Sequence, residues 1–327
     1  MSLWGREIEF CSLLPLTLSQ QLSTVTNKNY SNFMEILIGI LDGDGYIEIG
    51  PQKQYNKKFI TNPKQTIRIR IVLRLHKEDK ELLEFIIDKL NIGKLDELKS
   101  VNQYRLIIYK TDIINIIYPY LHTNNLEFLT YNRRKQFFLL KYIIDNNIHY
   151  WEDLDLALDD SGSLLYLKVY NLFKISNKKL EFSEIINLPY FKNWLIGFTI
   201  AEGSFHIKSN GKAYYSIVQS GHENYHIIKA IHYFIKGSEY LSHQIKPENE
   251  KIYRISFSSK KDLLFIINFF ENNKLLGLKK LQFDSWKSYI IGDNKINCSA
   301  PNVILSKVSN NNLLNNNNIN NNESSNE

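Results

Sequence analysis

The chain has 327 residues, of which 43% are hydrophobic, and this is enough to bury a core in two domains of ordinary size. Its net charge of +6 suits a polyanionic partner, and its two cysteines exclude a disulfide framework or a zinc cluster. No stretch reaches the ~18 consecutive apolar residues of a membrane span, so we expect no membrane partner. The abundance of Asn, Ile, Lys and Tyr is typical of an AT-rich genome, and we predict a mitochondrial location.

The first informative element is an apolar run that begins at Leu37 and ends in Asp42-Gly43-Asp44-Gly45. Asn32, with Glu35 three residues later, resembles a capping pair and predicts a helix that starts there and ends at the last glycine. We expect Gly45 to adopt the left-handed conformation that ends many helices. A calcium loop is excluded, because placing Gly45 at the invariant sixth position would make Ile40 and Pro51 ligands.

The elements that follow alternate between strand and helix periodicity. They are predicted strands at 46–49 and 66–76, a helix at 80–90, a strand at 104–109, and helices at 112–121 and 132–145. An acidic stretch and Asp160-Ser161-Gly162-Ser163 then indicate a connecting segment.

The opening motif recurs as the run from Leu195 to Gly203, in which Glu202 replaces Asp44. Asn187 and Pro189 predict the start of this second helix. Its flanks repeat as well, with predicted strands at 204–208, 214–220 and 253–258 and helices at 225–234, 261–272 and 278–289. The chain is therefore predicted to be an α+β protein of two pseudo-symmetric αββαββα repeats. The predicted segments are an extension (1–31), a first repeat (32–149), a linker (150–185), a second repeat (186–298) and an Asn-rich disordered tail (299–327).

Small residues four apart on each motif helix predict close packing of the two helices. They are Gly39 and Gly43 in the first, and Gly197 and Ala201 in the second. This packing would place Asp44 and Glu202 together at two helix C-termini, where a hard cation such as Mg²⁺ would offset their repulsion. Asp42 has Ile200 as its counterpart, so we do not count it as a ligand and interpret it as either solvated or supporting.

These motifs resemble the LAGLIDADG homing endonucleases in their single-chain, two-repeat form, over about residues 32–289. Further matching segments are 76–79 with 82–83 and 92–94, the stretch 253–256, and 276–283 with Trp286. The resemblance implies motif helices at the interface and two antiparallel sheets that form a DNA-binding saddle.

The resemblance also implies site residues. The metal would be bound by Asp44 and Glu202 with Gly43 and Ala201. A basic residue would begin the last helix of each repeat: Lys279 or Lys280 in the second, with Lys279 our prediction, and Arg133, Arg134 or Lys135 in the first, with Lys135 our prediction. Gln219 would occupy a polar position that organises water, and its first-repeat counterpart would be His76.

The alternating strand at 66–76 sends its isoleucines and leucines to one face and its basic residues to the other. Arginine forks suit guanine and phosphate, so we expect this face to bind DNA. The alternative is a cation-rich sheet that only keeps the protein soluble. The predicted DNA-binding residues are Arg68, Arg70, Arg74, His76, Lys53, Lys64, Lys208, Lys212 and Arg254; further candidates are Lys57, Lys58, Tyr214 and Lys246.

The main hypothesis is a monomeric, Mg²⁺-dependent endonuclease that breaks both strands of a DNA target and so initiates intron homing. One alternative is a maturase that binds its own group I intron RNA and assists splicing. Another is a DNA-binding transcription factor. The presence of both acids favours the enzyme, because a protein that only binds has no need to hold two carboxylates together.

Overall fold

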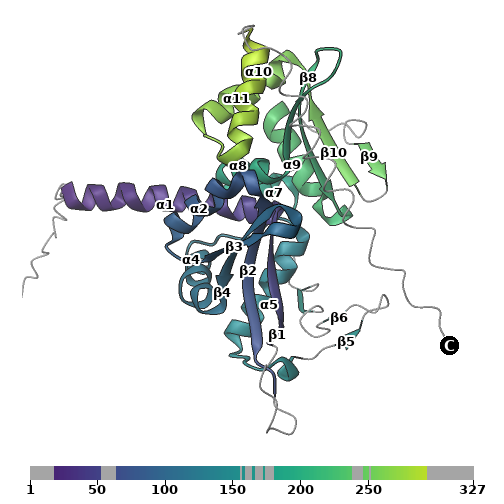
Figure 1. The fold of residues 1–327 in the computed structure, drawn as a ribbon. Helices are drawn as coiled ribbons and strands as arrows, with labels where there is room; N and C mark the ends of the chain where they lie inside the picture. Colours follow the sequence, from purple (N-terminus) through teal and green to yellow (C-terminus); the bar gives the residue numbers. More distant parts are fainter. Residues whose placement is uncertain are drawn as a thin grey trace, which may run out of the picture.

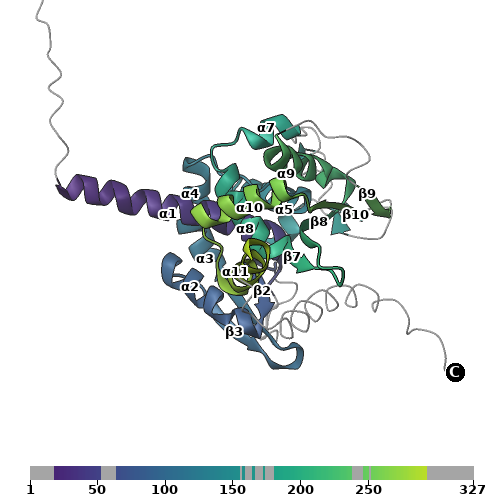
Figure 2. The same cartoon turned by 90° about the horizontal axis from the view of Figure 1, so that it is seen from above.

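The computed structural model describes residues 18–52, 64–154, 157–158, 164–165, 172–173, 180–237, 246–249 and 252–292. Two long helices, α1 (Leu18–Gly43) and α8 (Phe191–Glu202), lie side by side at the centre, and the first turns of α1 run out beyond the body of the molecule (Figures 1 and 2). The predicted tail and most of the predicted extension lie outside the described residues, and the exact boundaries of the five segments remain predictions.

Each motif helix is followed by a four-stranded antiparallel sheet. The first sheet has the order β1-β2-β4-β3 and the second has the order β7-β8-β10-β9. Its strands are β1 (Gly45–Pro51), β2 (Ile67–His76), β3 (Lys94–Leu98) and β4 (Gln103–Tyr109), and the second sheet contains β7 (Gly203–Ile207), β8 (Ala213–Ser220), β9 (Lys246–Asn249) and β10 (Ile252–Phe257). The predicted α+β class and the two αββαββα repeats are confirmed.

Helices connect and cover these sheets (Figure 1). In the first repeat they are η1 (Lys77–Asp79), α2 (Lys80–Leu90), η2 (Lys99–Val101), α3 (Lys110–Asp112), η3 (Ile113–Ile117), α4 (Tyr118–Thr123) and α5 (Tyr131–Asp145). After η4 (Trp151–Asp153) and the short pair β5 (Ala157–Leu158) and β6 (Leu164–Leu165), the second repeat contains α7 (Phe182–Ile186), η5 (His222–Asn224), α9 (Tyr225–Lys236), α10 (Lys260–Asn272) and α11 (Gly277–Ile291). None of the helices in the described ranges combines the length and apolar character of a membrane span.

The motif helices approach each other through glycine. A Cβ atom added at Gly39 would lie 2.1 Å from the backbone oxygen of Trp194, and one added at Gly197 would lie 1.9 Å from that of Ile36. Such distances are far below van der Waals contact, so the backbones meet where no side chain fits. The predicted close packing is confirmed, and it joins the apolar residues of both repeats into one core.

The predicted helix starts are wrong. The first helix begins at Leu18, so Asn32 lies inside it, because no glycine or proline interrupts the chain between them. Asn32 and Glu35 instead face the second repeat, where Asn193 Nδ2 donates to Asn32 Oδ1 (3.2 Å) and to Glu35 Oε2 (2.7 Å). The second helix begins at Phe191, beyond the predicted proline start.

The predicted left-handed conformation at Gly45 and Gly203 is also wrong. Gly203 is extended, with φ −71° and ψ 145°, and Gly45 is not among the residues of positive φ. Glycine is needed here for space: a Cβ at Gly45 would lie 2.8 Å from the Cα of Leu41, and one at Gly203 would lie 2.6 Å from the oxygen of Thr199. Each glycine lets a strand start directly against the last turn of its helix.

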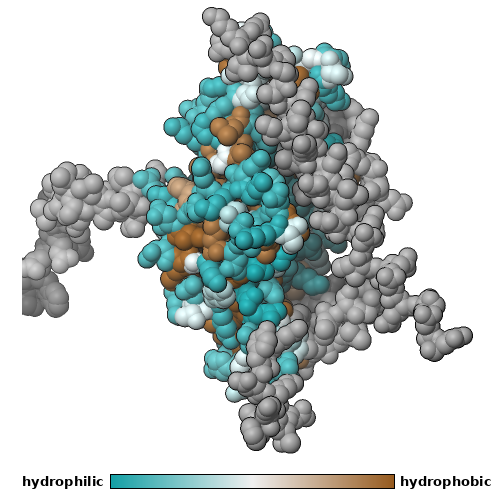
Figure 3. Space-filling view, in the orientation of Figure 1, coloured by the Kyte–Doolittle hydropathy of each residue, from teal (hydrophilic) through white to brown (hydrophobic). Residues whose placement is uncertain are grey.

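On the face drawn in Figure 3, the described surface is mainly hydrophilic, and hydrophobic side chains gather near the point where α1 leaves the body. The interior side of each sheet is apolar. Ile67, Ile69, Ile71 and Leu73 of β2 are all at most 3% exposed, and they pack in the same core as the motif helices. The opposite side of β2 carries the arginines, as the alternation predicted.

Candidate active site and nucleic-acid interface

Asp44 and Glu202 lie next to each other where the two motif helices end. Asp44 directly follows α1, and Glu202 is the last residue of α8. The ends are so close that a Cβ at Gly43 would lie 2.3 Å from the Cβ of Ala201 and 3.6 Å from Oε1 of Glu202. The structure therefore brings the two predicted carboxylates together.

This placement disfavours negative charge on both groups. Burial raises the pKa of Asp44 to about 6, and burial followed by the charge of Asp44 raises the pKa of Glu202 to about 7. The cations Lys279 and Arg133 act against both shifts. An additional cation at this site would therefore stabilise the ionised forms of both carboxylates.

Lys279 supplies one of the two cations that flank the carboxylates. It is the third residue of α11, and its Nζ donates to the carbonyl oxygen of Gly203 at 2.5 Å. Burial lowers its pKa, while Asp44, Asp79 and Glu202 act in the opposite direction. Lys280 pairs instead with Asp284 on its own helix, so the structure selects Lys279 from the two predicted lysines.

Arg133, rather than the predicted Lys135, is the second cation that acts on the two carboxylates. Arg133 is the third residue of α5, as Lys279 is of α11, and its Nε donates to the carbonyl of Leu41 at 3.0 Å. Burial lowers the pKa of Arg133, and the negative charges of Asp42, Asp44 and Glu202 oppose this. Residues two apart on a helix differ by about 200° in direction, so Lys135 starts from the opposite side of α5 to Arg133.

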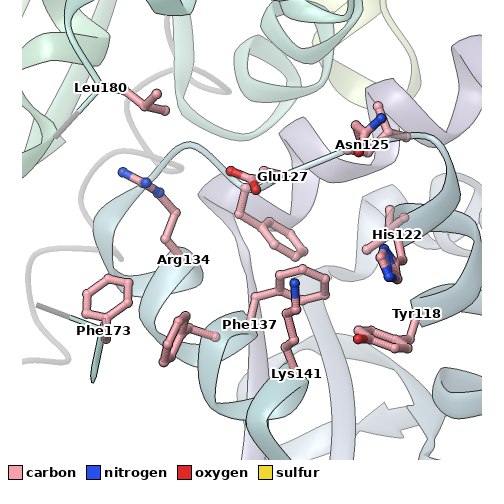
Figure 4. A pocket seen from close by; sticks show the side chains of 13 residues that line it. Tyr118, His122, Asn125, Glu127, Arg134, Phe137, Lys141, Phe173 and Leu180 are labelled. Carbon is pink, nitrogen blue, oxygen red and sulfur yellow. The ribbon is translucent and has the colours of Figure 1, made fainter. Parts of the chain in front are cut away.

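Arg134, the third candidate, is not among the cations that act on Asp44 and Glu202. It lines a cavity of about 450 Å³ with Glu127, Tyr118, Lys141 and Phe173, and Figure 4 shows Arg134 and Glu127 among the side chains of that cavity. Neither Asp44 nor Glu202 lines that cavity. This cavity is therefore separate from the candidate active site.

Gln136 holds Arg133 in place, and sequence reasoning missed it. Its Oε1 accepts from Arg133 Nη1 and from the backbone N–H of Ile47, both at 3.0 Å. One side chain thereby ties α5 to β1. Gln136 could have been identified only by knowing that α5 packs against β1, which the sequence does not reveal.

Asp42 is buried and supports the site, so the solvated alternative is wrong. Its carboxylate accepts from the backbone N–H of Leu129 (2.7 Å) and from the N–H (3.1 Å) and hydroxyl (2.6 Å) of Thr130. Trp194 Nε1 of the second motif helix adds a fourth bond at 2.7 Å. Burial raises the pKa of Asp42 to about 6 against these hydrogen bonds. The residue fixes the loop that leads into α5.

The strand register corrects the predicted equivalence of Gln219 and His76. Gly45 lies opposite Leu73, and Gly203 lies opposite Ile217. Counting along each strand from these pairs aligns Gln219 with Leu75 and His76 with Ser220. Gln219 therefore shares a strand face with Ile217, and its part in organising water remains a prediction.

The described residues contain no group of three or more His, Cys, Asp or Glu side chains that could hold a metal by themselves. Two carboxylates at helix C-termini, where backbone carbonyls lack helical partners, are nevertheless a donor set suited to Mg²⁺, which retains several waters. The raised pKa values of Asp44 and Glu202 fit such a cation, because each carboxylate needs a positive neighbour to ionise readily.

The exposed face of the first sheet is basic but partly paired. Arg68 Nη2 lies 2.7 Å from Glu48 Oε1, and Arg70 Nη1 lies 3.9 Å from Glu48 Oε2. Arg74 is exposed and lies over the ring of Tyr46. His76 Nδ1 lies 3.4 Å from Glu78. These side chains come from neighbouring positions of β1 and β2, so they form one surface.

Arg105 extends this surface and was missed from the sequence. It lies opposite Arg74 in the β2–β4 pairing and contacts Asp96 at 3.2 Å. Its signal was weak, because a single arginine in a short strand does not reveal which face it occupies. Lys64, by contrast, pairs with Asp153 at 2.7 Å. Lys53, Lys57 and Lys58 lie outside the described residues, and for Lys246 only the strand position is described.

The second sheet gathers a smaller basic cluster around Tyr214. Lys208 Nζ lies 4.5 Å and Lys212 Nζ 5.6 Å from the ring centroid, and His206 stacks on the ring at 5.3 Å. Burial, then Lys208 and Arg254, lower the pKa of His206. Arg254 lies opposite Val218, on the strand face that also carries Tyr214. The predicted second-sheet residues therefore share one face.

The fold and the site define a two-repeat α+β protein in which each repeat contributes one carboxylate to a shared helix interface. The family model for the LAGLIDADG endonuclease matches residues 37–144 and 195–290. The chain therefore belongs to the LAGLIDADG endonuclease family, as the motif resemblance predicted.

Individual relatives agree with this assignment. The chain is 27% identical to the protein named "Probable intron-encoded endonuclease Cox1-I1b" of Schizosaccharomyces pombe, over 85% of this chain and 69% of the relative. It is 24% identical to "Probable intron-encoded endonuclease aI3" of Dictyostelium discoideum, over 77% and 94% respectively.

Solved structures share the fold at lower sequence identity. I-SmaMI, bound to an uncleaved DNA target in the presence of calcium ions, matches with a TM-score of 0.60 and 19% identity, over 80% of this chain and 92% of that chain. The LAGLIDADG meganuclease I-CpaMI, bound to uncleaved DNA, matches with a TM-score of 0.57 and 20% identity, over 84% and 97%. Both similarities support the two-sheet architecture.

Proposed function

We propose that this chain is a site-specific, Mg²⁺-dependent endonuclease that hydrolyses one phosphodiester bond in each strand of a DNA target and thereby initiates intron homing. The observation that carries the proposal is the meeting of Asp44 and Glu202 between two helix ends, with Arg133 and Lys279 beside them. The intron-encoded relatives and the DNA-bound structural neighbours support the same reading.

Asp44 and Glu202, with the carbonyls of Gly43 and Ala201, would hold the metal. When bound, Mg²⁺ would supply Lewis-acid chemistry at this site, namely a lower pKa for bound water and neutralisation of charge on the phosphate. Arg133 and Lys279 are fixed cations in a partly buried site, where they stabilise the charge that develops on the phosphate. Their hydrogen bonds to the carbonyls of Leu41 and Gly203 hold them in place before DNA arrives.

The two sheets would bind the DNA. The arginine face of β2 and the cluster around Tyr214 present cations from both repeats, and arginine suits both phosphate and guanine. Because one chain supplies both halves of the site, a monomer is sufficient. A mitochondrial location is part of the proposal and is supported by the composition and by the intron-encoded relatives.

The test is cleavage of a supercoiled plasmid that carries the uninterrupted form of the gene surrounding this reading frame. The native protein with Mg²⁺ should yield linear DNA, and EDTA, Asp44→Asn or Glu202→Gln should abolish it. Glu84→Gln, which removes an exposed carboxylate on α2, is the matched control and should cleave normally. Tight binding of the intron RNA by a native protein that cleaves no DNA with any divalent metal would replace this proposal with the maturase. Specific DNA binding without cleavage would favour a transcription factor.

A further inference from the structure

The helices that carry the two cations are each capped by a side chain from the other repeat. In the first repeat, Asp79 is the last residue of η1, and its Oδ1 accepts from the backbone N–H of Leu278 at 2.8 Å, in the first turn of α11. In the second repeat, Asn224 is the last residue of η5, and its Oδ1 accepts from the backbone N–H of Tyr131 at 2.8 Å, in the first turn of α5. The two contacts are related by the pseudo-symmetry of the chain.

These contacts satisfy helix donors that nothing local satisfies. The first N–H groups of a helix lack intrahelical partners and are usually bonded by the side chain of the preceding residue. Neither α5 nor α11 has such a bond from its own cap position, which is held by Thr130 and Leu276 respectively. The partners arrive from across the interface.

The packing around both contacts is tight. A Cβ at Gly277 would lie 2.5 Å from Asp79 Oδ1, and Gly277 has a φ of +60°, so glycine is required there both for its conformation and for the approach of Asp79. Asn224 is only 4% exposed, and its Nδ2 donates to the carbonyl of Ser220 at 2.8 Å, which fixes the direction of the amide. Both acceptors are thus closely packed against the helix ends that they cap.

The capped turns are the turns that carry the cations. Lys279 follows Leu278 directly, and Arg133 lies two residues after Tyr131. We propose that Asp79 and Asn224 are reciprocal positioning residues: Asp79 of the first repeat sets the placement of Lys279 in the second, and Asn224 of the second sets the placement of Arg133 in the first. The nuclease role of the two cations rests on the proposed function, whereas the capping itself does not.

The proposal predicts effects that differ between DNA strands. If each cation assists cleavage of one strand, Asp79→Ala should slow one strand and Asn224→Ala should slow the other. A displacement of about 1 Å at a catalytic group costs on the order of 100-fold in rate, so a loss of about 10- to 100-fold on the affected strand is expected. Nicked circular plasmid should then accumulate before linear product. Lys279→Met should affect the same strand as Asp79→Ala, and Arg133→Met the same strand as Asn224→Ala.

The experiment follows each strand separately with two end labels on the plasmid-derived target duplex, in Mg²⁺. Asp79→Asn keeps a carbonyl oxygen at the acceptor position, so it should return cleavage of the affected strand toward the native rate. A merely structural role would slow both strands equally and would not be rescued in one strand alone. A strand pattern of Asp79→Ala that differs from that of Lys279→Met, or of Asn224→Ala that differs from that of Arg133→Met, would overturn the proposal.

Hydrogen exchange measured without DNA or metal provides an independent readout. Asp79→Ala should accelerate amide exchange in the first turn of α11, in the other repeat, and Asn224→Ala should do so in the first turn of α5. Acceleration confined to the substituted repeat would overturn the proposal. If the native protein cleaves neither strand, the proposed function fails. The exchange experiment then tests by itself whether Asp79 and Asn224 cap the helices of the other repeat.

Discussion

Trp194 of the second motif helix donates its indole N–H to Asp42 of the first at 2.7 Å, deep in the interface between the repeats. The same carboxylate accepts the backbone N–H groups of Leu129 and Thr130. One side chain therefore joins the two motif helices and the loop before α5. Because this loop leads into the helix that carries Arg133, the hydrogen bonds of Asp42 join the helix interface to the candidate active site.

Replacing Asp42 with alanine should strongly destabilise the protein. The substitution leaves several buried donors without an acceptor, and each unsatisfied donor costs about 1–3 kcal/mol, so we expect the free energy of unfolding to fall by about 3 kcal/mol or more. Trp194→Phe removes one donor and leaves the others bonded, and it should cost less. Urea unfolding of both variants measures the difference. Equal stabilities for Asp42→Ala and the native protein would contradict the buried network.

The glycines of the motif helices should tolerate no side chain. Gly39→Ala and Gly197→Ala place a methyl group against backbone atoms of the opposite helix, which cannot move aside without separating the repeats. We expect each to lower the free energy of unfolding by about 3 kcal/mol or more, or to prevent folding. Gly50→Ala is the matched control, since its nearest neighbour atom is the flexible end of Arg68 at 3.7 Å. Thermal unfolding should show Gly50→Ala close to native; a similar loss in all three would mean that helix contact is not the cause.

Without metal, stability should fall as pH rises through the acidic range. The pKa of Asp44 is raised from 3.8 to about 6 and that of Glu202 from 4.5 to about 7, so the native state binds more protons than the unfolded state between those limits. The free energy of unfolding therefore decreases from about pH 4 to about pH 7. The double variant Asp44→Asn, Glu202→Gln should show a shallower slope and greater stability at pH 8. Asp42 remains in it and retains part of the slope, because burial also raises its pKa. An unchanged slope would show that the pKa values of Asp44 and Glu202 are not raised in the native state.

A divalent cation should reverse this destabilisation. At pH 8, Mg²⁺ or Ca²⁺ at a concentration about 100 times Kd would stabilise the native protein by about 3 kcal/mol, which corresponds to a rise in Tm of about 5 °C. Asp44→Asn and Glu202→Gln should each remove the shift, while Glu84→Gln retains it. Differential scanning calorimetry with and without EDTA makes the measurement. A shift that persists in both site variants would place the cation elsewhere.

Arg74 should contribute to DNA affinity in a way that salt reveals. It is exposed on the basic face of β2, whereas Arg68 and Arg70 are near Glu48. If Arg74 binds phosphate, Arg74→Ala should weaken binding to target and unrelated duplexes alike and reduce the slope of log K against log salt by about 1; if it reads a base, the loss should be confined to the target. Fluorescence anisotropy at several salt concentrations separates these outcomes. Lys287→Ala, which removes a cation paired with Glu271 on α10, is the control. An unchanged affinity for both duplexes would remove Arg74 from the interface.

Much of this architecture could be predicted from local pattern. Three patterns each lie within a single helix or strand: the period of two in β2, the repeated apolar-to-acidic motif and the small residues four apart. For these the structure agrees with the prediction. The predictions that failed depended on neighbours. Asn32 looked like a helix cap because only its own helix was considered, and in the structure it faces Asn193 of the other repeat.

The sequence alone indicated which two carboxylates meet, because a helix with small residues four apart that ends in an acid and glycine occurs twice, at matching positions of the two repeats. It could not determine which basic residue accompanies them, since Arg133, Arg134 and Lys135 are adjacent in sequence and differ only in direction around α5. Tertiary packing decided that choice, and it also decided the roles of Asp42, Asp79 and Asn224. These side chains act on backbone groups far away in the chain, and a hydrogen bond between distant segments leaves no periodic trace in the sequence.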